Sequence, residues 1–301
     1  EQSKEKMEHF APTLKTGNVF DILNTGFESA TTYFINWETI TKKDNTAIRD
    51  SERKKFFERI SEAHNRNLNF IVIIDEEHQN NTSKAYDIIS SINSKYEIRV
   101  SETPKKRVVW EFYEIPEIDV INEGLITRFM YINDGLDTVA VENTLHETDI
   151  LLEKADEIRK QIAQAYIDEK EDIRPLVLVQ FPNLNDNLIE HVEDKLNLMG
   201  YSYENKFLAS WFSAENKEGK DRKSKKLGKI NIGTTEDDSI TKSNATPVFL
   251  LFKQALATGW DCPRAKKLVK LRENMSETFE IQTLGRLRRM PKAKHYGKEI
   301  L

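Results

Sequence analysis

Short apolar runs alternate with segments of helical period along most of the chain. The run Asn69–Ile74 (NFIVII) is compact and β-branched, which predicts a strand buried on both faces. It is followed by Thr82–Ile92, whose apolar residues recur at the spacing of a helix. The same reading places further strands at 31–36, 96–100 and 108–113, and a helix at 50–64. This alternation predicts an α/β fold with parallel sheets covered by helices.

A long amphipathic segment, Glu142–Asp172, joins two halves of the chain. After it the alternation restarts, with strands predicted at 176–181, 248–252 and 267–271 and helices at 184–199 and 277–290. Residues 215–244 are polar and charged and read as a solvated insertion. We therefore expect a first domain at 1–115, a connecting helical segment at 116–172, and a second domain at 173–301.

Composition narrows the class of protein. The 301 residues are 38% hydrophobic, enough for about two domains with their own cores. No apolar run is long enough to span a membrane, and the N-terminus has no signal-peptide core, so we expect a soluble, intracellular protein without a membrane partner. The single cysteine, Cys262, excludes an intrachain disulfide framework and a thiolate zinc cluster.

The net charge differs between the whole chain and its C-terminal part. The whole chain carries −5, which taken alone argues against a nucleic-acid partner. From Leu251 to Leu301, however, 12 Lys and Arg stand against 5 Asp and Glu. Because local potential governs attraction to phosphates, the overall charge does not exclude DNA.

Four short segments could carry chemistry. The first is Asp75-Glu76-Glu77-His78, directly after the NFIVII run. At the carboxyl end of a parallel strand, Asp75 could hold Mg²⁺ and Glu76 could activate an attacking water. A solvated acidic turn that caps the next helix is an equally good reading. His78 alone does not make a closed zinc site, because no second His or Cys is near it in the sequence.

The second segment, Ser101-Glu102-Thr103-Pro104, ends the next predicted strand. Its hydroxyl groups could hydrogen-bond the acidic cluster, although simple strand termination by proline explains the same pattern.

The third segment, Lys253–Pro263 (KQALATGWDCP), follows the predicted strand VFLLF. Gly259 permits close approach of a ligand, and Asp261 offers a carboxylate to a sugar hydroxyl. A Gly-Trp turn that closes a strand–helix connection is the alternative.

The fourth segment is Gln282–Pro291 (QTLGRLRRMP). On a helix, Arg286 and Arg289 share one face while Arg288 points elsewhere. Two guanidinium groups on one face could clamp a polyphosphate and stabilise charge at a γ-phosphoryl group. A basic helix with a solvated face is the alternative.

The order of these segments is more specific than any one of them. The chain resembles superfamily 2 helicases and translocases, which have paired RecA-like domains with ATP in the cleft between them. Within that group it looks most like the helicase part of the Res subunit of type III restriction enzymes. The resemblance rests on the four segments above and on Phe34–Ile40 (FINWETI), and it spans about residues 30–296.

That resemblance implies roles in the first domain. Asp75 and Glu76 would be the Walker B pair, Asp75 for Mg²⁺ and Glu76 for the hydrolytic water, with His78 beside them at the nucleotide. Ser101 and Thr103 would belong to the motif that couples hydrolysis to domain movement.

It also implies roles in the second domain. Gly259 and Asp261 would lie at its nucleotide edge, and Gln282, Arg286 and Arg289 would reach across the cleft to ATP. Arg289 would be the arginine finger, and Arg286 a second γ-phosphate contact.

The expected contacts to the nucleic-acid backbone are Asn183, Lys253 and Thr258. The implied cofactors are ATP and Mg²⁺, and the implied partners are DNA and a modification (methyltransferase) subunit. The implied location is the cytoplasm of a prokaryote.

One family feature does not occur. A phosphate-binding loop needs G-x-x-x-x-G-K-[ST], but Gly-Lys occurs only at 219–220, 228–229 and 297–298, followed by Asp, Ile and Glu. We therefore expect this chain to be an internal piece of a longer protein, with weak ATP affinity and no DNA cleavage. The motor motifs leave open a helicase acting on RNA or in DNA repair. A non-catalytic nucleic-acid-binding protein also stays open.

Overall fold

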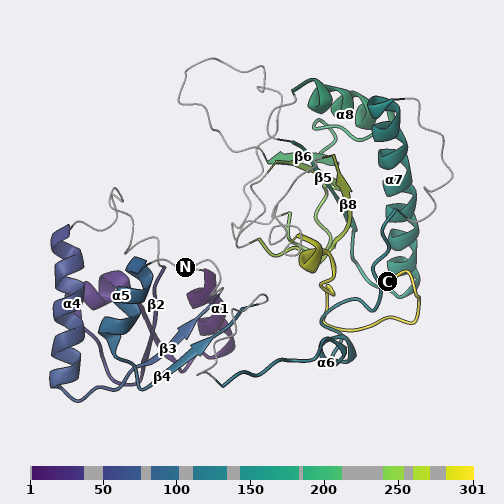
Figure 1. Cartoon of the computed structure of the whole chain (residues 1–301). Helices are drawn as coiled ribbons and strands as arrows, with labels where there is room; N and C mark the ends of the chain where they lie inside the picture. The colour runs from purple at the N-terminus through teal and green to yellow at the C-terminus, as the bar shows by residue number, and fades with distance from the viewer. Residues whose placement is uncertain are drawn as a thin grey trace. The chain divides into compact units, whose positions relative to one another are not determined.

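The computed structural model describes residues 2–36, 50–75, 83–101, 111–133, 143–182, 186–211, 240–253, 260–271 and 283–301. The chain divides into two compact units, Glu1–Phe112 and Tyr113–Leu301. Each is described by itself below (Figure 1). Within the described ranges, no helix is long and apolar enough to cross a membrane.

The described part of the first unit contains two pairs of parallel strands and four helices. Strand β1 pairs with β2, and β3 pairs with β4. The elements in chain order are α1 Gln2–Phe10, β1 Lys15–Asn18, α2 Val19–Thr25, β2 Thr31–Phe34, α4 Asp50–Asn65, β3 Ile71–Ile74, α5 Ser83–Ile92 and β4 Tyr96–Arg99.

The core of the first unit forms where α2, α4 and α5 meet the strands. Phe27 contacts the rings of Tyr33, Phe56 and Phe70 edge-on, and Ile60 is buried in the same cluster. These residues come from four separate elements or connections, so the aromatic cluster joins strands and helices into one body.

One prediction for this unit is wrong. Strand β3 is not buried on both faces, because Ile71 and Ile73 are 63% and 67% exposed while Ile74 is buried. Their register partners on β4, Tyr96 and Ile98, are exposed as well. The described core gathers on one side of this strand pair only.

Of the strand predicted at 108–113, residues 111–113 are not in a strand, and the rest lies outside the described residues.

The second unit is built on a four-stranded parallel sheet in the order β6-β7-β5-β8. Its elements are α6 Glu117–Asn122, α7 Thr144–Asp168, β5 Leu176–Gln180, α8 Asp186–Leu198, β6 Leu208–Trp211, β7 Phe249–Phe252 and β8 Ala265–Lys270, followed by a helical turn at 283–287. Every residue of β5 and β7 is buried, and all are apolar except Gln180 at the end of β5, as expected for strands covered on both faces. The predicted α/β class with parallel sheets is confirmed.

Two apolar layers cover the sheet of this unit. Val177, Val179 and Leu251 pack with Leu152 of α7 and Val192 of α8 on one face. The other layer includes the buried residues Leu176, Leu178, Leu250, Phe252, Trp260, Cys262 and Ile240. Ile240 falls in the last part of the segment predicted to be a solvated insertion, and it is fully buried. Residues 215–239 of that segment lie outside the described residues.

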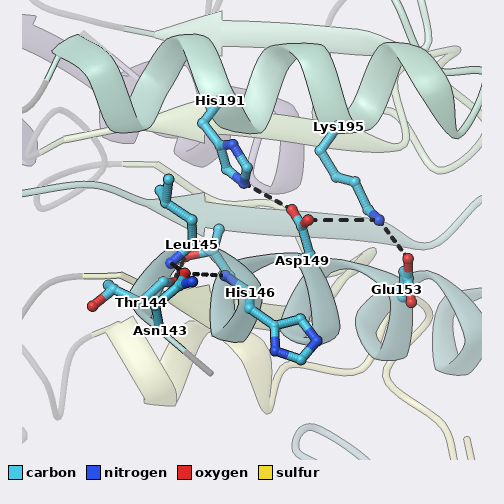
Figure 2. Close-up of polar contacts among 9 residues, drawn as sticks. Asn143, Thr144, Leu145, His146, Asp149, Glu153, His191 and Lys195 are labelled. Carbon is cyan, nitrogen blue, oxygen red and sulfur yellow. Dashed lines mark hydrogen bonds and ion pairs between the residues drawn. The ribbon is translucent and has the colours of Figure 1, made fainter. Parts of the chain in front are cut away.

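Helix α7 is held to α8 by polar contacts as well as by the apolar layer (Figure 2). His191 Nε2 lies 2.8 Å from Asp149 Oδ1, and Lys195 Nζ lies 2.5 Å from Glu153 Oε1. The side chain of Asn143 accepts hydrogen bonds from two backbone amides and so caps the start of α7. The long helix therefore belongs structurally to the sheet of the second unit.

Candidate functional site

The predicted Walker B and coupling segments begin at one edge of the first unit. Asp75 directly follows β3, and Ser101 comes two residues after the last residue of β4. The two strands are parallel and in register, and Val100 donates its backbone N–H to the carbonyl oxygen of Ile74 at 2.8 Å. The structure therefore brings Asp75 and Ser101 to the carboxyl ends of two adjacent strands, where ligands bind in open α/β sheets.

Asp75 is exposed at this edge, and Ser101 is partly buried. An exposed carboxylate at a strand end is a suitable oxygen ligand for a hydrated Mg²⁺. The other predicted residues of these segments, Glu76, His78 and Thr103, lie outside the described residues.

The second unit brings two of the predicted segments into direct contact. Arg289 Nη1 donates a hydrogen bond to Asp261 Oδ1 at 2.6 Å. Asp261 comes from the GWD segment and Arg289 from the QTLGRLRRMP segment. The ion pair joins two residues that lie 28 positions apart in the sequence. Both side chains are nearly half exposed, so the pair is accessible to a ligand.

Asp261 owes its position to its two neighbours. Trp260 and Cys262 are buried in the apolar layer beneath the sheet, at 5% and 2% exposure. With both neighbours anchored inward, the Asp261 carboxylate is directed outward. Burial also raises the pKa of the Cys262 thiol to about 11, so this cysteine is neutral and structural.

A buried arginine fixes the same turn. Arg264 is 1% exposed and donates to the backbone carbonyl oxygens of Ile240, Arg174 and Pro247 at 2.8–3.0 Å. Burial lowers the pKa of this guanidinium to about 10. Arg264 thus ties the residues after the GWD segment to the starts of β5 and β7. Sequence reasoning gave this arginine no role.

Replacing Arg264 with lysine is expected to lower the free energy of unfolding by about 3 kcal/mol, since one ammonium cannot reach all three carbonyl oxygens. Urea denaturation of the full chain measures this loss. The exposed Arg128→Lys change is the matched control and should stay within about 0.5 kcal/mol of the parent. Equal losses in the two variants would contradict the role of Arg264.

The backbone of Arg289 is held from two sides. Lys266 Nζ on β8 donates to the Arg289 carbonyl oxygen at 2.5 Å. Residues 125–127 run antiparallel to 288–290, with a bridge between Ile126 and Arg289. The bridge connects parts of the chain that lie more than 100 positions apart, so no local pattern could have revealed it.

The predicted helix at 277–290 needs correction at its end. Helical structure stops at residue 287, and Arg289 lies in the bridge with Ile126 rather than on a helix. Pairing with 125–127 and the following Pro291, which disfavours helix in the preceding residue, explain this end. Arg286 is on the helical turn, so the two arginines do not share a helix face.

The expectation that Arg288 points elsewhere agrees with its contacts. It donates to Glu117 Oε1 of α6 at 2.6 Å. This hydrogen bond lowers the pKa of Glu117.

Among the remaining predicted site residues, Lys253 directly follows β7 at the carboxyl edge of the sheet and is partly buried. Asn183, Thr258, Gly259 and Gln282 lie outside the described residues.

The chain matches several solved structures, among them a fragment assigned as an HsdR subunit of a type I restriction enzyme from Vibrio vulnificus YJ016. The identity is 15% and the TM-score 0.43, over 93% of this chain and 51% of that one. The chain thus spans about half the length of this neighbour, and the likeness is too low to assign residue roles. No family model and no curated protein matches the sequence.

Proposed function

We propose that this chain is the motor module of an ATP-dependent DNA translocase or helicase of the restriction–modification type, similar to the Res subunit of type III enzymes. The observation that carries the proposal is the Arg289–Asp261 contact, which joins two motif segments beside a parallel sheet. The placement of Asp75 and Ser101 at adjacent strand ends supports it.

The Arg289–Asp261 pair suits a residue that must change partners. An ion pair with both side chains nearly half exposed contributes only about 0–1 kcal/mol, so a phosphate can replace the carboxylate at little cost. The backbone of Arg289 stays fixed by Lys266 and Ile126 while its guanidinium moves. This combination of a held backbone and a releasable side chain is what a γ-phosphate contact requires.

In the proposed reaction each group has a distinct task. Asp75 would hold Mg²⁺, Glu76 would orient and deprotonate water, and Arg289 would stabilise charge on the transferred phosphoryl group. Bound Mg²⁺ would neutralise charge on the phosphates of ATP. Lys253, together with Asn183 and Thr258, would contact the DNA backbone without reading sequence. A modification subunit would then supply sequence recognition.

The phosphate-binding loop would have to come from outside these 301 residues. We define the long form as this chain together with the sequence encoded immediately upstream of it. The 301-residue chain should bind labelled ATP weakly, and the long form should bind it tightly and only with Mg²⁺. Sub-micromolar, Mg²⁺-dependent binding by the chain alone would contradict the proposal, as would the lack of a G-x-x-x-x-G-K-[ST] sequence upstream.

A further inference from the structure

A cavity of about 950 Å³ lies within the second unit, and part of the QTLGRLRRMP segment lines it, namely Thr283, Leu284, Leu287 and Arg288. Its walls are α7, β8, the helical turn at 283–287 and the segments 127–133 and 295–301. Neither Asp261 nor Arg289 lines it. The volume is within the range of small-molecule sites, which is about 300–1,000 Å³.

The long walls of the cavity are apolar. Leu151, Ile158 and Ile162 line it from α7, and Leu268 and Leu287 line it from β8 and the helical turn. The segment 127–133 adds large, exposed side chains to the lining, Phe129, Met130, Tyr131 and Ile132. Such walls favour a ligand with a flat or extended apolar body.

One wall also carries a cation whose charge is not balanced by its contacts. Lys266 lines the cavity, and its ammonium contacts the carbonyl oxygen of Arg289 and, at 3.9 Å, the Sδ atom of Met290. Neither partner is charged. Lys266 is partly buried, and desolvation lowers its pKa to about 8, which is the expected response of an ammonium shielded from water without an anion beside it.

A second polar group lines the same cavity. Gln180, at the end of β5, is fully buried, and within the described residues neither its Oε1 nor its Nε2 has a hydrogen-bond partner. It pairs in register with Lys270, four residues after Lys266 on β8. At about 3.3 Å per residue, the backbone positions of Gln180 and Lys266 are therefore roughly 13 Å apart along the strand direction.

We propose that this cavity binds an organic anion with an aromatic or other flat apolar body, whose negative end pairs with Lys266. The anion would balance the positive charge of Lys266, and the body would lie between α7 and the wall made by Leu268 and Leu287. A polar group at the far end of the ligand would supply the hydrogen bonds that the Gln180 amide lacks. The proposal does not depend on the motor function.

The first test uses 8-anilinonaphthalene-1-sulfonate, an aromatic anion, as a fluorescent probe of the full 301-residue chain. Lys266→Met should weaken its binding at least tenfold, because the variant keeps the length of the side chain but removes its charge. Lys206→Met, which removes an exposed lysine outside the cavity, should change binding less than twofold. Equal affinities for the two variants would overturn the proposal.

Hydrogen exchange locates the bound probe. Protection should fall on α7 and on 127–133, whereas protection confined to the exposed strand pair β3–β4 would overturn the proposal. If Lys266→Met does not fold, Leu151→Trp serves instead, because it fills the apolar wall and should also abolish binding.

Displacement of the probe by AMP would identify a nucleotide as the source of the anion, and displacement by 1-naphthoate alone would identify an aromatic acid. Displacement by neither would contradict the site.

Discussion

Replacing Arg289 with alanine in the long form is expected to lower kcat for ATP hydrolysis by about 10³-fold or more, with ATP affinity nearly unchanged. An arginine finger stabilises charge that develops only in the transition state, so its loss acts on the chemical step. Steady-state kinetics gives kcat, and an equilibrium titration with labelled ATP gives the affinity.

Arg288→Ala is the matched control for this experiment. Arg288 is the next residue along the chain, but its guanidinium contacts Glu117 rather than Asp261. Its loss should change kcat only a few-fold. A large loss of ATP binding in Arg289→Ala, or equal kcat losses in the two variants, would count against the finger role.

The change Glu76→Gln should lower kcat in the long form by about 10²- to 10⁴-fold, the range of a lost general base. Glutamine keeps the size of the side chain but cannot take a proton from water, so Mg²⁺-dependent ATP binding should persist. Rapid-quench measurement of phosphate release, with ATP binding measured in parallel, separates the two effects.

The neighbouring Glu77→Gln change provides the comparison, since the proposal gives Glu77 no role. Its rate should stay within a few-fold of the parent. An ATPase rate that Glu76→Gln leaves unchanged would show that the Walker B assignment is wrong.

Strands with continuous apolar runs could be predicted from the sequence, as could β2, β4 and β8, whereas β1 and β6 could not. Strands β5 and β7 are buried throughout and are evident from their composition. Strand β1, Lys15–Asn18 (KTGN), contains no hydrophobic side chain, and only its pairing with β2 makes it a strand. Strand β3 misled the sequence analysis because an apolar run does not reveal that one of its faces remains exposed.

The residues of the candidate site also divide into those that the sequence predicted and those that it could not. Local motifs placed Asp75 and Ser101 at strand ends, because residues that follow a strand closely must lie at its edge. The partner of Asp261 and the supports of Arg289 could not be predicted, since Ile126 lies far from Arg289 in the sequence and Lys266 contacts a backbone carbonyl oxygen. Arg264 is a further case: its role comes from three backbone carbonyl oxygens, which leave no trace in the side-chain sequence.

The central claim is that this chain couples ATP hydrolysis to DNA. The most direct measurement is the steady-state ATPase rate of the long form with and without duplex DNA, using two duplexes of unrelated sequence. The account predicts that both duplexes raise the rate to a similar extent, and that added salt suppresses the increase because the contacts are to phosphates. An ATPase rate that DNA does not change, or no hydrolysis at all, would contradict it.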